Sequence, residues 1–188
     1  HAEYSEEQES KDKNARLVYK QNENHQSRLY EANVWYRGGF RVSVTQSLVD
    51  YVLKSRYEDL PNEAIKWGKL RVLDALGCAL AGYRTSLGKA VVNAFDFPSK
   101  PESTIIGSDR RIFSRDAAFV NSTLVNALDF DDDTPSGHPS STIIPAAIAI
   151  GERTGASGKE FLTAVTAAYE VCTRVGVATS PSSERAQV

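Results

Sequence analysis

Apolar residues recur at three- and four-residue intervals along most of the chain after residue 44, a spacing typical of one face of an α-helix. The pattern predicts helices that begin near Thr45, Pro61, Ser86, Ser114, Pro145 and Ser157. Ser103–Gly107 is the one segment whose pattern favours a short extended strand. A single short strand does not change the class, so the sequence predicts an all-α fold.

The helix ends are predicted from capping residues. Thr45 is expected to cap the first helix, whose apolar face carries Leu48, Val49, Val52 and Leu53. Pro145 suits the first turn of the fifth helix. Ser157 and Glu160 have capping-box spacing, and the helix that they start is expected to end at Gly176. The polar residues after that glycine are expected to lack regular structure.

The second helix combines large and small apolar residues. Its leucines recur at three- or four-residue intervals, at Leu70, Leu73, Leu76 and Leu80. Small residues lie among them, at Ala75, Gly77, Ala79 and Ala81. Small side chains let a neighbouring helix come close, so we expect tight helix packing here.

The polarity of the chain divides it into three parts. Residues 1–41 are rich in Glu, Lys, Gln, Asn and Ser, with too few apolar residues at helical spacing to bury a face. They are expected to form a flexible polar N-terminal extension. Residues 42–177 hold the helical pattern and form the predicted domain, and residues 178–188 form a polar tail.

Composition and charge narrow the class of protein. With 41% apolar and 24% charged residues in a chain of 188, one globular domain is expected. A formal charge of −2 provides no field that would attract nucleic acid or an anionic membrane. Without a run of about 18 apolar residues, no membrane span is expected. We expect a cytoplasmic protein, or a mitochondrial matrix protein in a eukaryote.

The cysteines and the charged residues have different distributions. Cys78 and Cys172 lie within apolar helical patterns without a CxxC spacing, so they are expected to be small buried side chains. Ionisable groups instead gather in Leu128–Ser140, which contains His138 and four aspartates, Asp129, Asp131, Asp132 and Asp133. The sequence therefore places any chemistry in this acidic loop.

Two interpretations of the acidic loop fail on spacing or context. A calcium loop counted from Asp129 needs glycine at its sixth position and glutamate at its twelfth, but Thr134 and Ser140 stand there. The Asp-x-Asp nucleophile of phosphatases needs a preceding buried strand, whereas residues 119–128 have a helical period. An unpatterned aspartate cluster is a weak signal for a metal, so no metal site is expected, and an acidic-loop metal site is kept as the lowest of the alternatives.

Two interpretations of the same loop remain open from the residues alone. The aspartates and His138 can be structural, bonding the backbone at a helix end and in a turn. Alternatively, a carboxylate orients His138, which passes a proton to or from a substrate. Four carboxylates at a helix C-terminus repel its dipole, so in either case something must offset that repulsion.

Four segments together, from about Val44 to Gly176, resemble the MmgE/PrpD family, the 2-methylcitrate dehydratase group. They are Leu70–Gly82, Asn126–Ser141, Pro145–Gly155 and Ala164–Gly176, in the family's order and spacing. The resemblance implies a two-domain, usually dimeric protein with a large all-helical domain and a smaller α/β lid. The related activities are 2-methylcitrate dehydration, cis-aconitate decarboxylation and iminodisuccinate epimerisation. All transfer a proton beside a carboxylate, and the resemblance implies that they do so without a metal or organic cofactor.

The resemblance also implies roles for particular residues. Asp129 and His138 fall on the catalytic positions, with His138 as proton donor or acceptor and Asp129 orienting it. Asp131 and Thr134 belong to the same motif and are expected to bind substrate. The loop carries an extra aspartate relative to many relatives, so the resemblance assigns no role to Asp132 or Asp133.

The resemblance further implies a second histidine, basic residues and a tyrosine from later in a family member, which complete the site. We therefore expect this chain to be an incomplete helical domain, a truncated relative with little activity of its own. Its expected partners are a small polycarboxylate and either a second copy or a full-length relative; no nucleic acid and no membrane are expected. The alternatives are a non-catalytic binding or assembly module and a cis-aconitate decarboxylase-like enzyme.

Overall fold

The all-α prediction is confirmed by the computed structural model, which describes residues 43–134 and 137–185, with side chains up to residue 178. The predicted extension at residues 1–41 lies outside the described part. The helices are α2 (Val44–Lys54), the 3-10 turn η1 (Tyr57–Asp59), α3 (Asn62–Gly82), α4 (Ser86–Ala94), α5 (Ser114–Asn126), α6 (Ser140–Thr154) and α7 (Gly158–Arg185). None of the described helices is long and apolar enough to cross a membrane.

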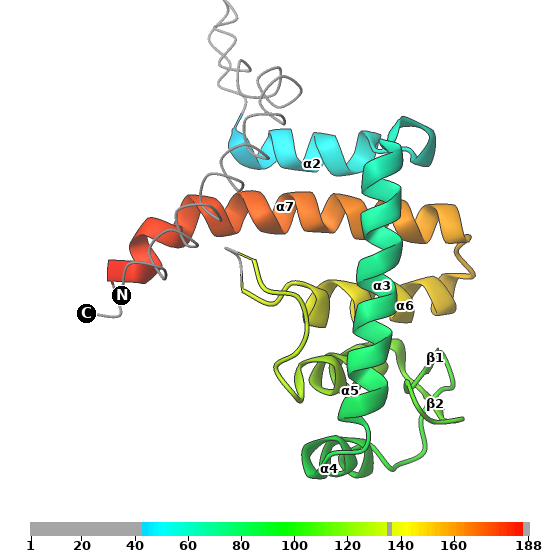
Figure 1. Ribbon diagram of the computed structural model, residues 1–188. Coiled ribbons are helices and arrows are strands. Elements are labelled where there is room, and N and C mark those ends of the chain that lie inside the picture. The colour runs from blue at the N-terminus through cyan, green and yellow to red at the C-terminus, as the bar shows by residue number, and fades with distance from the viewer. Residues whose placement is uncertain (1–42, 135–136, 186–188) are drawn as a thin grey trace, which may run out of the picture. The chain divides into compact units, whose positions relative to one another are not determined.

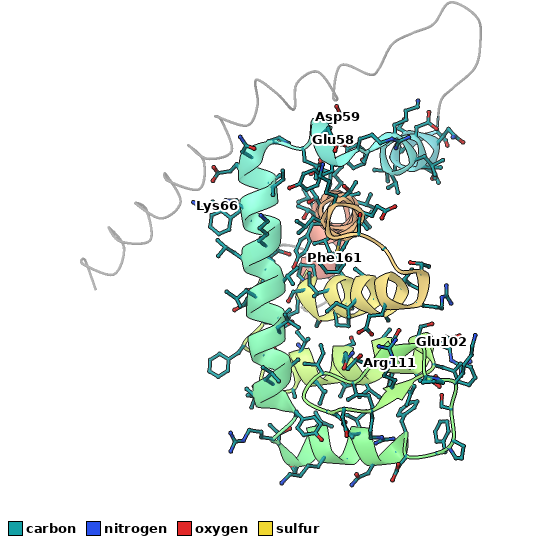
Figure 2. The ribbon with its side chains drawn as sticks, turned by 90° about the vertical axis from the view of Figure 1, so that its right-hand side faces the viewer. Glu58, Asp59, Lys66, Glu102, Arg111 and Phe161 are labelled. Atoms are coloured by element: carbon teal, nitrogen blue, oxygen red, sulfur yellow. The ribbon has the colours of Figure 1, made fainter. Side chains whose placement is uncertain are left out.

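Helix α3 runs across the other helices of the domain, along one side of α5, α6 and α7 (Figures 1 and 2). Its small residues form the contact face, because Ala75, Ala79 and Gly82 are buried. A Cβ on Gly82 would collide with the carbonyl oxygen of Leu124 in α5. The glycine is therefore required for the close approach of the two helices.

The expected tight packing of α3 is confirmed at Ala75 and Ala79, whereas Gly77 and Ala81 are exposed. The leucines do not form the buried face. Leu73 is 67% exposed, and Leu70 and Leu80 are exposed as well. Lys66, on this outer side, points away from the other helices in Figure 2.

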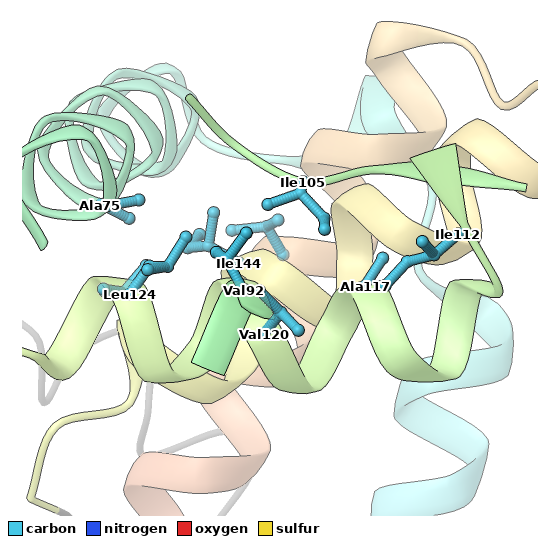
Figure 3. Packing of buried hydrophobic residues seen from close by; sticks show 11 residues of the cluster. Ala75, Val92, Ile105, Ile112, Ala117, Val120, Leu124 and Ile144 are labelled. Atoms are coloured by element: carbon cyan, nitrogen blue, oxygen red, sulfur yellow. The ribbon is translucent and has the colours of Figure 1, made fainter. Parts of the chain in front are cut away.

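The core lies where α5 meets α6, α3 and a small hairpin (Figure 3). Its largest fully buried apolar side chains are Ile105, Leu124, Ile144, Val120, Val125 and Val165. Burying an aliphatic side chain of this size contributes about 1.5–3 kcal/mol. The packing therefore fixes α5 and α6, the two helices that flank the acidic loop.

The hairpin pairs β1 (Ser103–Thr104) with β2 (Arg111–Ile112) in antiparallel register. The extended segment expected at Ser103–Gly107 is confirmed at its start. Asn121 of α5, fully buried, holds the hairpin through both ends of its amide. It accepts from the Ile106 N–H at 2.9 Å and donates to the Thr104 carbonyl at 2.9 Å.

The expected cap of α2 and the expected end of α7 are wrong. Ser43, not Thr45, caps α2, because its hydroxyl accepts the Gln46 N–H at 3.1 Å. Helix α7 does not end at Gly176 but continues to Arg185. A glycine costs a helix only about 1 kcal/mol relative to alanine, which is too little to end α7 by itself.

Helix α6 begins at Ser140, five residues before the expected first turn at Pro145. Pro145 lies inside the helix and is buried. Proline removes one helical hydrogen bond, and the burial of its neighbour Ile144 offsets that loss. The early start matters for the site, since it places the first turn of α6 directly after His138.

Candidate active site

The acidic loop begins with a sharp turn at Asp129. Helix α5 ends at Asn126, and the Asp129 N–H donates to the Asn126 carbonyl at 3.0 Å. Asp129 has φ of 55°, the one positive φ among the described non-glycine residues. Aspartate tolerates this left-handed conformation better than most residues. The turn reverses the chain and leaves Asp129 outside and Asp131 inside.

The far side of the loop is closed by a second turn. Thr134 and Gly137 exchange backbone hydrogen bonds of 3.0 and 2.8 Å, and Gly137 adopts a φ of 83°. The Thr134 hydroxyl also donates to the Gly137 carbonyl at 3.2 Å. His138 follows directly, so its backbone is held between this turn and the start of α6.

His138 lies between two carboxylates. Its Nε2 is 3.4 Å from Oδ1 of Asp129, and its Nδ1 is 3.5 Å from Oδ1 of Asp131. The Asp129 side chain is 79% exposed, whereas that of Asp131 is fully buried. Asn126 donates to Oδ1 of Asp131 at 3.1 Å and so fixes the inner carboxylate. The imidazole therefore has one nitrogen toward the interior and one toward solvent.

Two atoms at the inner end of this arrangement are buried without a hydrogen-bond partner among the described residues, Nδ1 of His138 and Oδ2 of Asp131. A buried polar group left unpaired costs about 1–3 kcal/mol. The 3.5 Å separation of Nδ1 from Asp131 is just beyond ordinary hydrogen-bond length. A small shift of the ring would complete the bond, so the geometry suits a histidine that tightens against Asp131.

Asp132 points away from His138 and into the helices. Its Oδ1 accepts the Ser140 N–H at 2.9 Å, and its Oδ2 accepts from the Tyr169 hydroxyl at 2.9 Å and from the Arg71 guanidinium. Burial and the nearby Asp132 raise the pKa of Tyr169, which keeps its hydroxyl protonated as a donor. Arg71 supplies the positive charge that offsets the carboxylates at the end of α5.

Arg71, Tyr169 and Asn126 support the site but were not among the residues expected from the sequence. Arg71 follows the buried Gly68 by three positions and precedes the buried Ala75 by four, so it shares the inner face of α3. The sequence signal that could have identified Arg71 is its spacing of three and four positions from small residues on the same helix face. Asp133, by contrast, is exposed.

A cavity of about 400 Å³ opens beside His138. It is lined by Leu87, Phe119, Ser122, Thr123, Asn126, Ala127, His138 and Ser141. None of these described lining residues is a lysine or an arginine. A larger cavity of about 910 Å³ lies between α2, η1 and α7, but it is lined by none of the expected site residues. The smaller cavity is therefore the candidate site.

Asp129, Asp131 and His138 also form the described group that could hold a metal ion, each offering one ligand atom within 4.8 Å of the others. Two carboxylates and one imidazole are a common partial ligand set for a divalent cation. Exposed acidic groups often gather without an ion. The same arrangement of an imidazole between two carboxylates is also compatible with proton transfer.

The fold and the site define an all-helical domain that presents an aspartate–histidine pair beside a cavity. Its sequence matches the model of the MmgE/PrpD N-terminal domain over residues 46–187. The chain therefore belongs to the MmgE/PrpD family, and the resemblance of the four segments is confirmed.

Relatives with assigned names agree with this family. The chain is 29% identical over 147 residues to the cis-aconitate decarboxylase-like protein oryM of Aspergillus oryzae, covering 72% of this chain and 30% of that protein. It is 33% identical over 113 residues to the cis-aconitate decarboxylase of Mus musculus, covering 58% of this chain and 23% of the mouse protein. The chain thus spans less than a third of the length of these relatives.

Proposed function

We propose that this domain contributes the histidine and its carboxylates to a cofactor-independent lyase that acts on a small polycarboxylate. The observation that carries the proposal is the position of His138 between Asp131 and Asp129 at the edge of a cavity. Family membership and the names of the relatives support a lyase-type function.

In the proposed reaction, His138 exchanges a proton with the substrate at its outer nitrogen, Nε2. For a dehydration, the imidazole takes a proton from a carbon beside a carboxylate and the electron pair forms the double bond. The imidazolium then gives that proton to the departing hydroxyl, which leaves as water. Asp131 would accept a hydrogen bond from Nδ1 and stabilise the imidazolium that forms. Thr134, which belongs to the same motif, is still proposed to bind the substrate.

The geometry supports a reassignment of the two aspartates. Asp129 was expected to orient His138 and Asp131 to bind substrate. Because the Asp131 side chain is fully buried, it suits the orienting role, and the exposed Asp129 suits contact with substrate. Two carboxylates cannot by themselves hold an acidic substrate, and the described cavity lining contains no lysine or arginine. We therefore propose that further cationic groups complete the site.

The test is to incubate the chain with 2-methylcitrate or with cis-aconitate and to follow water loss or carbon dioxide release by NMR. Any turnover by the proposed site should be abolished in His138→Ala. The control is Arg115→Lys, on the exposed side of α5, which should leave turnover unchanged. Because we propose that cations are missing from the cavity, the expected turnover is slow. Turnover that persists in His138→Ala would contradict the assignment of His138.

The second candidate function is a non-catalytic assembly module that associates with a second copy or with a full-length relative. The observation that favours it is the exposed apolar side of α3, with Trp67, Leu70, Leu73 and Leu80. Contiguous exposed apolar residues often mark protein interfaces. A folded monomer at every concentration in sedimentation velocity, unchanged by added full-length relative, would count against this candidate.

A further inference from the structure

The carboxylate of Asp132 joins the acidic loop to three helices. Arg71 belongs to α3, Tyr169 to α7, and the Ser140 N–H to the first turn of α6. The Asp132 side chain is only 14% exposed. The Arg71 guanidinium also lies over the Tyr169 ring, 4.5 Å from its centroid, so the two donors brace each other.

His138 lies inside the loop that this carboxylate closes. The Asp132–Ser140 hydrogen bond spans the segment that contains His138, and the Ser141 hydroxyl donates to the His138 carbonyl at 2.7 Å. One residue before Asp132, Asp131 faces Nδ1 of the same histidine. A shift of Asp132 would therefore change the separation of His138 from Asp131.

We propose that Arg71 and Tyr169 are positioning residues for His138, acting through Asp132 to fix the imidazole against Asp131. The inference deepens the proposed function, because it matters for catalysis only if His138 transfers the proton. Neither residue lines the described cavity beside His138, so each acts through the loop and not by contact with substrate. The Arg71 guanidinium supplies a positive charge to Asp132, and the Tyr169 hydroxyl supplies a directed hydrogen bond.

A merely structural role would lower stability without a specific change at His138. The distinguishing quantity is the rate at which diethyl pyrocarbonate acylates His138, measured by peptide mass spectrometry. Measuring the rate over a range of pH gives the limiting rate of the neutral imidazole, free of any change in its protonation. His1 and His25 report reagent activity in the same sample.

The decisive variant is Tyr169→Phe, which removes one hydroxyl and keeps the ring. Losing a hydrogen bond to a charged group should raise the population of open loops, in which the whole imidazole of His138 and not only its outer nitrogen meets the reagent. The limiting rate at His138 should rise with it by roughly tenfold. Arg71→Lys keeps the charge but loses the planar fork, so a rise is expected there too. Matched controls are Tyr83→Phe, a half-buried tyrosine outside the site, and Arg115→Lys.

A limiting rate at His138 that stays within about twofold of wild type in folded Tyr169→Phe would overturn the proposal. Circular dichroism confirms the fold, and Tyr169→Phe decides the matter if Arg71→Lys unfolds. The readout needs no turnover, so it separates the two hypotheses. A chain without lyase activity can still show the rise, and an active chain can fail to show it.

Discussion

The two faces of α3 bury and expose the opposite residues from those that their hydrophobicity suggests. The inner face, with Ala75, Ala79 and Gly82, is buried against α5, whereas the outer face exposes Leu73 and Trp67. Close approach of two helices depends on small side chains, because a large one holds the backbones apart. The comparison teaches that a leucine repeat locates an apolar face but not the face that meets the core.

The largest difference should appear when one leucine is removed from the inner contact and another from the outer face of α3. Leu124→Ala, in α5 against the inner face, should lower the free energy of unfolding by about 3 kcal/mol, because the side chain is fully buried. Leu73→Ala on the outer face should change it by less than about 0.5 kcal/mol. Urea denaturation measures both, and equal losses would contradict the comparison.

Two glycines of α3 give a matched pair with opposite signs. Gly82→Ala should lower the free energy of unfolding by about 2 kcal/mol, because its Cβ meets the Leu124 carbonyl. Gly77→Ala should raise it by about 0.5–1 kcal/mol, because nothing lies within 4 Å of its Cβ and alanine favours the helix. Thermal unfolding followed by circular dichroism would show whether Gly77→Ala is instead destabilising, which would mean that this face is covered.

A charge on the outer face should affect association and not the fold. Under the proposed assembly role, Leu73→Asp should weaken self-association by roughly tenfold, because it places a charge on the exposed apolar side of α3. Sedimentation velocity at several concentrations measures the effect. Ala90→Asp, on the exposed part of α4, is the control and should leave association unchanged. Equal weakening by both variants would locate the interface elsewhere.

The smallest effect concerns acid stability and depends on Glu102, which precedes the hairpin and contacts the start of α5. Lys100 and the Ser114 N–H lower the pKa of Glu102 from 4.5 to about 2. A folded pKa below the unfolded one means that the stabilisation is present above pH 4.5 and is lost as the pH falls toward about 2. Glu102→Gln should flatten the acid side of the stability curve in that window. If Glu102→Gln loses stability in acid as much as wild type does, Glu102 is not the cause of the acid sensitivity.

The sequence could predict the features that are set by residues close together in the chain. The helical period identified the helices, and Asp129, Asp131 and His138 lie within one loop. It could not predict that Asp132 pairs with Arg71, which lies 61 positions away, or with Tyr169, which lies 37 positions away. Their pairing follows from how α3 and α7 pack. The start of α6 was missed because the polar residues Ser140–Thr142 are typical of a loop. In the structure, Asp132 accepts the Ser140 N–H from across the turn and so caps the helix there.

The two hydrogen bonds of Asn121 to the hairpin have a consequence for modification of the chain. Asn121-Ser122-Thr123 has the pattern of an N-glycosylation acceptor. In the folded domain the Asn121 amide is fully buried, and its nitrogen already donates to the Thr104 carbonyl. A sugar could be attached only before the domain folds. Its bulk would then prevent the hairpin from packing on α5, so a glycosylated chain would not reach this fold.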